Sequence, residues 1–211
     1  RRQRQMCIRD RIRLGTGVMI MPQRNPLVTA KAVATLDRLS EGRVILGVGS
    51  GWLEEEFQAL GVSFDDRGAR TDEYLQAMQL AWASDIASYE GKFVDFSNVY
   101  SRPQPVNNHV PIVVGGHSKR AARRAGELGD GFFPGRGHPD ELSALFDHAR
   151  RCAERAGRDP NELEFTTGGP TTPEYVEQMA KIGVTRIVVP PMNPEHFPAF
   201  GEEVIAQYAG L

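Results

Sequence analysis

Apolar residues gather in short runs that alternate with stretches of helical spacing. Six of these runs are rich in Val, Ile, Leu and Phe, which is typical of strands covered on both faces. They lie at residues 12–21, 44–48, 111–115, 130–133, 163–167 and 186–190. Between them, apolar residues recur every three or four positions, as in helices that bury one face. The pattern therefore predicts an α/β protein with a parallel sheet and helices outside it.

The clearest predicted helix covers residues 26–40. Asn25 is a suitable N-cap, and Pro26 suits the first helical turn because its missing N–H is not needed there. The stripe predicted to face the core comprises Val28, Ala32, Leu36 and Leu39. Apolar residues on another side of the helix predict a surface for a homodimer. These residues are Leu27, Val33 and Ala34.

Two architectures fit six strand–helix units: an open doubly wound sheet and a barrel. Glycines follow the carboxyl ends of several strands, at positions 15, 17, 47, 49, 51, 115, 116, 168 and 169. An open sheet requires close backbone approach mainly at its switch point, whereas a barrel gathers all the strand ends around one mouth. The glycines therefore favour the barrel. Because six strands cannot close an eight-stranded barrel, two strands are expected to be absent or supplied in another way.

Residues 84–110 interrupt the alternation and are too long for a simple connector. A small hairpin is predicted around Gly91. Two interpretations of this insertion remain open at this point: a surface excursion, or a lid over the mouth of the barrel.

Composition narrows the class of protein. The 211 residues carry a net charge of −2, which provides no basic surface for nucleic acid. No apolar run approaches the roughly 20 residues that cross a bilayer. Two cysteines, at 7 and 152, and five scattered histidines predict neither a disulfide framework nor a metal site. A cytoplasmic location is the resulting expectation.

Two glycine-rich turns differ in the charges that follow them. After residues 47–52, three glutamates at 54–56 fill the first helical turn, where they suit the helix dipole and would repel a phosphate. After residues 115–117, Ser118 is a suitable N-cap, but Lys119 and Arg120 then oppose the dipole. An anion at this second helix start would explain those cations, which predicts the phosphate site there.

A further group of charged residues is predicted to form an exposed ion-pair network at the start of a helix near Thr71. Its members are Arg67, Arg70, Asp72 and Glu73.

Taken in order, several segments resemble the luciferase-like monooxygenase superfamily, and within it the oxidoreductases that depend on the deazaflavin coenzyme F420. The segments are RLGTGV (13–18), LDRLSEGR (36–43), LGVGSGW (46–52), EFQALG (56–61), RGARTDEY (67–74), PIVVGG (111–116) and GDGFFP (129–134). The resemblance implies a (β/α)8 TIM barrel of the luciferase-like type, incomplete, with strands 3–8 present and the first two strands missing. It implies a single domain over residues 12–211, with residues 1–11 outside the family pattern.

The resemblance also implies how a cofactor is bound. Gly17 and Val18 match a non-prolyl cis peptide on a bulge that lies against the cofactor ring. The turn matched beside the ring comprises Ser50, Gly51 and Trp52, and the matched phosphate-binding segment comprises Gly115, Gly116, His117 and Ser118. Trp52 departs from the acidic residue of some family members that oxidise sugar phosphates. No catalytic residue is identified.

The implied function is hydride transfer between coenzyme F420 and a small organic substrate. One alternative is an FMN-dependent monooxygenase that uses oxygen and a partner reductase. Another is a flavin-binding protein without catalytic activity. The family pattern also implies a homodimer.

Overall fold

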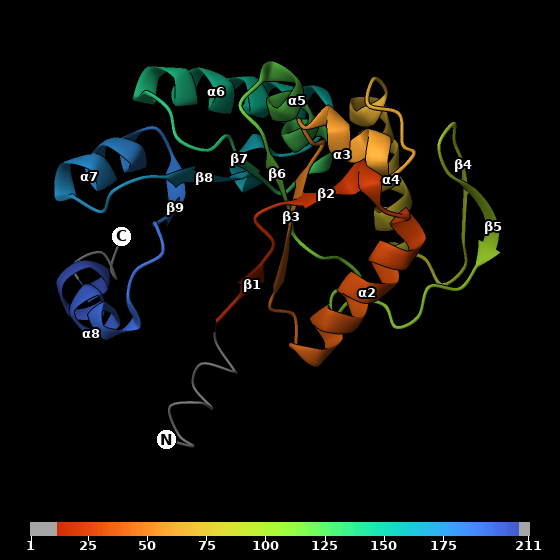
Figure 1. The fold of residues 1–211 in the computed structure, drawn as a ribbon, viewed down its shortest axis with the longest axis horizontal. Coiled ribbons are helices and arrows are strands. Elements are labelled where there is room, and N and C mark those ends of the chain that lie inside the picture. Colours follow the sequence, from red (N-terminus) through yellow and green to blue (C-terminus); the bar gives the residue numbers. More distant parts are fainter. Residues whose placement is uncertain (1–11, 207–211) are drawn as a thin grey trace.

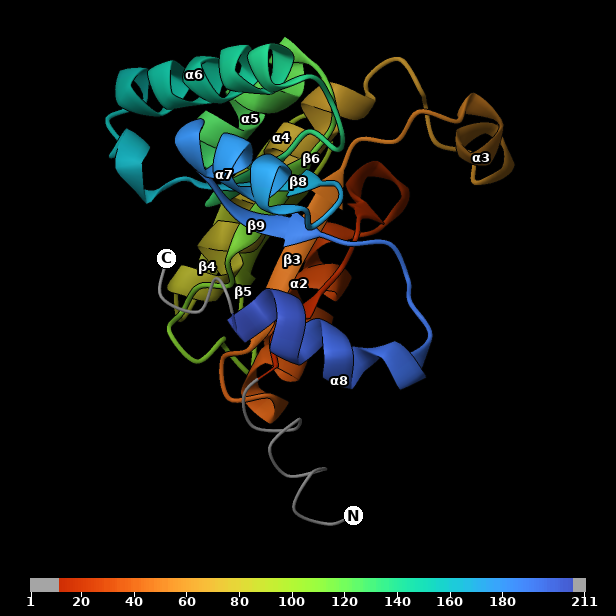
Figure 2. The ribbon, with the colours of Figure 1, turned by 90° about the vertical axis from the view of Figure 1, so that its left-hand side faces the viewer.

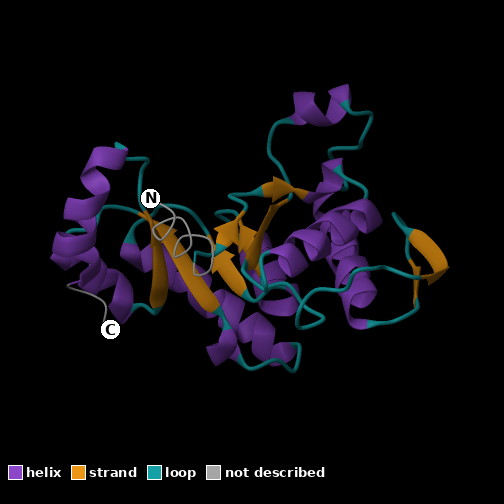
Figure 3. Cartoon of the chain, turned by 90° about the horizontal axis from the view of Figure 1, so that it is seen from below, coloured by secondary structure: helices purple, strands orange, loops and turns teal. Residues whose placement is uncertain are grey.

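The computed structural model describes residues 12–206, which form a curved parallel sheet with helices outside it (Figure 1). The sheet runs in the order β1-β3-β6-β7-β8-β9, and β2 also pairs with β3. Its strands are β1 (Leu14–Gly15), β2 (Met19–Ile20), β3 (Val44–Gly49), β6 (Ile112–Gly115), β7 (Gly131–Phe133), β8 (Glu164–Gly168) and β9 (Val184–Val188). Seen from below, the helices surround the strands (Figure 3).

The helices follow the strands in the predicted alternation. They are α2 (Pro26–Leu39), α3 (Glu54–Ala59), α4 (Arg67–Ala83), α5 (Lys119–Leu128), α6 (Pro139–Arg155), α7 (Pro173–Lys181) and α8 (Phe197–Phe200), which continues into a π-helical turn at Gly201–Ile205. Cys7 and the rest of residues 1–11 lie outside the described residues, as do residues 207–211. Within residues 12–206, no helix combines the length and the apolar character needed to cross a membrane.

The strand order confirms the barrel and excludes the doubly wound sheet. Consecutive strands of the sheet follow one another in sequence, and all their pairings are parallel, so there is no point at which the order reverses. The result is part of a parallel barrel in which β1 and β2, both paired with β3, together take the place of one strand. In the described part of the chain, β1 and β9 form the two open edges.

Helix α2 is correctly predicted in position but wrongly in orientation. Asn25 caps it by accepting N–H bonds from Leu27 and Val28. The stripe predicted to be core is exposed instead: it comprises Val28 (69% exposed), Ala32, Leu36 (55%) and Leu39 (77%). The buried face carries small residues and Asp37, whose carboxylate accepts the N–H of Val106 at 2.9 Å. Small residues face inward because Trp82 packs there, with its indole N–H donating to the carbonyl of Ala30 at 3.0 Å.

The predicted dimer surface on α2 is wrong for the same reason. Val33 and Ala34 belong to the core, and Leu27 is partly buried. A homodimer remains a prediction, and the exposed stripe of α2 is the face of this helix that could take part in it.

The insertion forms the predicted hairpin and lies outside the barrel. Strands β4 (Ala87–Glu90) and β5 (Asp95–Val99) pair antiparallel and pack against α4. The Glu73 carboxylate, from α4, accepts N–H bonds from three successive hairpin residues, Lys92, Phe93 and Val94, at 2.6–3.0 Å. No residue of 84–110 lines the cavity described below, which favours the surface excursion over the lid.

A pair formed by a histidine and a carboxylate lies where β6 and β7 begin. His109 Nε2 lies 2.9 Å from Asp130 Oδ2, and the same oxygen accepts the N–H of Ile112 at 2.7 Å. The hydrogen bond with Asp130 raises the pKa of His109, although burial and the nearby Arg158 oppose the change. Because the folded-state pKa is raised, the stabilisation is complete below the ordinary value of about 6.5 and is lost as pH rises through the folded value.

We therefore expect the contribution of the His109–Asp130 pair to the melting temperature to decrease between about pH 6 and pH 8. The effect is small, about 1–2 °C, because the His109 side chain is 42% exposed and the pair is screened by solvent. His109→Gln should remove this contribution, as measured by thermal unfolding at both pH values. The same slope in both proteins would contradict the assignment.

Candidate functional site

A bulge divides the first predicted strand into β1 and β2. The peptide between Gly17 and Val18 is cis, as the resemblance implied. Thr16 anchors the bulge by donating its hydroxyl to the carbonyl of Gly47 at 2.7 Å. A Cβ atom at Gly17 would meet nothing within 4 Å, so this stretch of backbone borders open space.

The glycines of β3 and β6 make room for this bulge. A Cβ on Gly47 would overlap the carbonyl oxygen of Thr16. On Gly49 or Gly115 it would lie 3.0 Å from a methyl group of Val18. The sequence argument assigned these glycines to the mouth of a barrel in general. The structure gives a narrower cause, because the bulge lies directly against them.

The turn after β3 presents Trp52 to the solvent. Gly51 has a φ of +82°, and a Cβ there would lie 2.6 Å from the Phe57 ring. The turn is held by two bonds from α4: Arg67 Nε donates to the carbonyl of Gly51 at 3.2 Å, and the hydroxyls of Thr71 and Ser50 lie 3.2 Å apart.

The start of α5 has a capped first turn with free N–H groups, as an anion site requires. Ser118 caps the helix by accepting the N–H of Ala121 at 3.2 Å. No described residue accepts the N–H groups of Lys119 or Arg120, as expected for the first turn of a helix. Gly116 has a φ of +131°, so any side chain there would strain the backbone.

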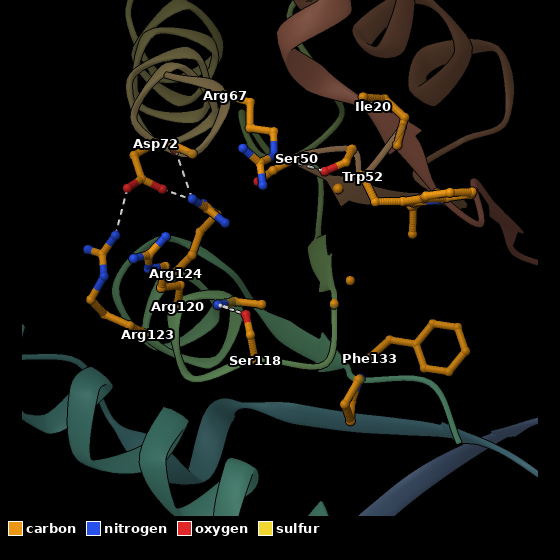
Figure 4. Close-up of a pocket in the computed structure, with 18 of the residues that line it drawn as sticks. Ile20, Ser50, Trp52, Arg67, Asp72, Ser118, Arg120, Arg123, Arg124 and Phe133 are labelled. Atoms are coloured by element: carbon orange, nitrogen blue, oxygen red, sulfur yellow. Dashed lines mark hydrogen bonds and ion pairs between the residues drawn. The ribbon is translucent and has the colours of Figure 1, made fainter. Parts of the chain in front are cut away.

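One cavity of about 660 Å³ joins these segments (Figure 4). The predicted residues that line it are Gly17, Val18, Ser50, Gly51, Trp52, Gly115, Gly116 and Ser118. His117 does not line it. Its Nδ1 lies 3.2 Å from the carbonyl of Pro134, and its Nε2 lies 4.0 Å from a carboxylate oxygen of Glu141. The assignment of His117 to the site is therefore not supported by the structure.

Sequence reasoning missed the charged wall of the cavity. Helix α4 begins at Arg67 rather than near Thr71, and both Arg67 and Asp72 line the cavity instead of forming an exposed network. Further lining residues come from α5 and from the segment after β7; they include Arg120, Arg123, Arg124 and Phe133. A signal was present, because the three arginines of α5 lie at helical spacing, and residues 67–74 were among the family segments.

Asp72 joins α4 to α5. It accepts a bond from Arg123 Nη2 at 2.7 Å and a second one from Arg124 Nε. Arg124, with a side chain only 6% exposed, also donates to the carbonyl of Gly68 at 2.8 Å. Burial alone would lower the pKa of Arg123, but the bonds to Asp72 and the charge of Glu127 leave it raised.

Two other arginines, Arg67 and Arg120, line the cavity and add positive charge to its wall. Arg67 bonds to carbonyl groups and stacks on the Phe64 ring at 3.7 Å, and Arg120 lines the cavity close to the start of α5. Neither has a carboxylate partner within 4.0 Å among the described residues. The arrangement can hold an anion at the start of α5, where the free N–H groups of the helix and the Arg120 side chain line the cavity.

Comparison with known proteins identifies the family. Residues 10–190 match the model of the luciferase-like monooxygenase family. An uncharacterized protein of Mycobacterium tuberculosis is 34% identical over 184 residues, which cover 87% of this chain and 63% of that protein. An FMNH2-dependent dimethylsulfone monooxygenase of Pseudomonas putida is 29% identical, over 85% of this chain and 50% of that enzyme. The chain thus spans less than two thirds of these relatives.

A solved structure shares the fold. The coenzyme F420-dependent tetrahydromethanopterin reductase of Methanopyrus kandleri superposes with a TM-score of 0.79 at 18% identity, covering 94% of this chain and 84% of that one. At this identity the likeness concerns the fold alone. The sequence match, in contrast, extends over most of the chain, and the protein belongs to the luciferase-like monooxygenase family.

Proposed function

We propose that the protein is an oxidoreductase in which hydride passes between coenzyme F420 and a small organic substrate. The observation that carries the proposal is the single cavity that joins the Gly17–Val18 bulge, the Ser50–Trp52 turn and the start of α5. A long cofactor with a flat ring and a phosphate requires such a cavity, with a bare backbone surface at one end and an anion site at the other. The F420-dependent enzyme of the same fold is consistent with this choice of cofactor.

The residues present fit such a cofactor. The phosphate would be held at the start of α5 by the N–H groups of Lys119 and Arg120, together with the Arg120 side chain. The ring would lie against the backbone at Gly17, where the cavity has open space. The position of Glu54, Glu55 and Glu56 supports the choice of α5 over α3 for the phosphate, because they occupy the first turn of α3 and do not line the cavity. Helix α3 projects away from the body of the molecule (Figure 2).

Coenzyme F420, when bound, supplies the hydride chemistry at its ring. The residues of this chain would orient the cofactor, neutralise its phosphate and keep water from the apolar end of the cavity near Trp52 and Phe133. No general acid or base is assigned. In the described part of the chain, the ionisable residues that line the cavity lie at the start of α4, just before it, or on α5. That side of the cavity is the one proposed to hold the phosphate. A homodimer and a cytoplasmic location are part of the proposal.

The phosphate site is tested by two neighbouring charge removals. We expect Arg120→Gln to weaken F420 binding by about tenfold, because it removes a charge-assisted bond to the phosphate. Lys119→Gln removes the same charge one residue earlier, at a side chain that does not line the cavity. This control should change the dissociation constant by less than about threefold. Isothermal titration of both variants provides the measurement, and equal losses would refute the site.

FMN is the alternative cofactor, and it is favoured by the FMNH2-dependent relative. Titration of the wild-type protein with F420 and with FMN decides between them. Tighter binding of FMN, with oxygen consumption when a reductase is added, would replace the proposal by a monooxygenase. Cofactor binding without turnover of any substrate would favour the non-catalytic flavin-binding protein.

A further inference from the structure

Trp52 has an unusual combination of order and exposure. Its indole is 82% exposed, although the turn that carries it is fixed by hydrogen bonds from Arg67 and Thr71. The other tryptophan, Trp82, is 1% exposed and donates its indole N–H to a backbone carbonyl. An exposed indole on the wall of a cavity presents a large flat apolar surface to a ligand.

The cavity is divided by polarity. Trp52, Ile20 and Phe133 lie on one side, whereas Asp72 and the arginines of α5 lie on the opposite side (Figure 4). The other lining residues near Trp52 are apolar or glycine, apart from Ser50 and Arg67, whose Nε donates to the carbonyl of Gly51. All the charged lining residues in the described part of the chain come from α4, from the loop just before it or from α5; they are Asp65, Arg67, Asp72, Arg120, Arg123 and Arg124.

We propose that Trp52 determines substrate specificity by stacking on an uncharged substrate with a flat apolar face. The inference rests on the proposed function, which assigns the arginine side of the cavity to the phosphate of the cofactor. A charged substrate group beside Trp52, Ile20 and Phe133 would lose water on this apolar side of the cavity, which is unfavourable. The lining cation near Trp52 is Arg67, and it already donates to the backbone carbonyls of Gly51 and Phe64. An indole, in contrast, offers a rigid surface that loses little conformational freedom when a planar molecule stacks on it.

Two planar probes of equal size test the proposal: naphthalene-2-carboxamide, which is neutral, and naphthalene-2-carboxylate, which is an anion. Each is titrated calorimetrically into the protein with and without saturating F420. We expect the amide to bind at least about tenfold more tightly than the carboxylate. Trp52→Ala should weaken amide binding by about tenfold, whereas Trp52→Phe, which keeps a flat ring, should stay within about threefold of the wild type. Tyr100→Ala is the matched control, because Tyr100 is 66% exposed and lies outside the cavity.

Three outcomes would overturn the proposal: equal affinity for the two probes, an unchanged affinity in Trp52→Ala, or displacement of the amide by F420. The last would mean that Trp52 stacks on the cofactor ring. Failure of the proposed function is seen separately, in the titration of F420 itself. If F420 does not bind but the amide still binds selectively through Trp52, the cofactor assignment falls and the preference of Trp52 for a neutral planar ligand is upheld.

Discussion

Gly47→Ala is expected to destabilise the protein by about 3 kcal/mol or more, and to lower its melting temperature by roughly 6–12 °C. The added Cβ would overlap the carbonyl oxygen of Thr16, which belongs to the backbone and cannot turn away as a side chain can. The bulge at Gly17 and Val18 would have to move, and with it the surface proposed to meet the cofactor ring. Chemical denaturation gives the stability change, and F420 titration gives the accompanying loss of binding.

The matched control is Gly15→Ala, on the strand that pairs with β3. A Cβ at Gly15 would have its nearest neighbours 3.9 Å away, in ordinary contact, and Gly15 is exposed. We expect a change in stability below about 0.5 kcal/mol. Similar losses for the two alanine variants would show that close contact with Thr16 is not what requires glycine at position 47.

Asp72→Ala should destabilise the protein by about 3–5 kcal/mol, because it leaves the guanidinium of Arg124 buried without its carboxylate partner. The change would also remove one of the two carboxylate partners of Arg123, leaving Glu127, and would loosen the contact between α4 and α5, on which the anion site depends. Urea denaturation measures the loss. Asp85→Ala is the control, since it removes an exposed ion pair with Arg102 and should cost at most about 1 kcal/mol.

A second substitution separates the buried charge from the other effects. In the Asp72→Ala background, Arg124→Leu removes the unpaired charge and should recover at least about half of the lost stability, since replacing a buried ionic pair by apolar residues is often tolerated. No recovery would mean that the loss arises elsewhere, for example from the lost bond between Asp72 and Arg123.

Local patterns in the sequence were sufficient for the order of the elements. The apolar runs predicted the strands to within a few residues, because buried parallel strands need continuous apolar sequence. The cap residues Asn25 and Ser118 were also identifiable, since capping depends on the residue type next to the helix start. The family resemblance singled out eight of the residues that line the cavity, but it also included His117 and missed Ile20, Phe133 and the charged wall.

Only the tertiary structure decided which side of each element faces the core and which charges face one another. Apolar spacing gave α2 two possible faces, and the choice fell to the one with Ala30 and Ala34, because the large Trp82 side chain of α4 fills the space beside them. Asp72 pairs with two arginines of α5 that are far from it in the sequence: Arg123 is 51 positions away and Arg124 is 52 positions away. No local pattern encodes such a contact, because it exists only once both helices pack on the same sheet.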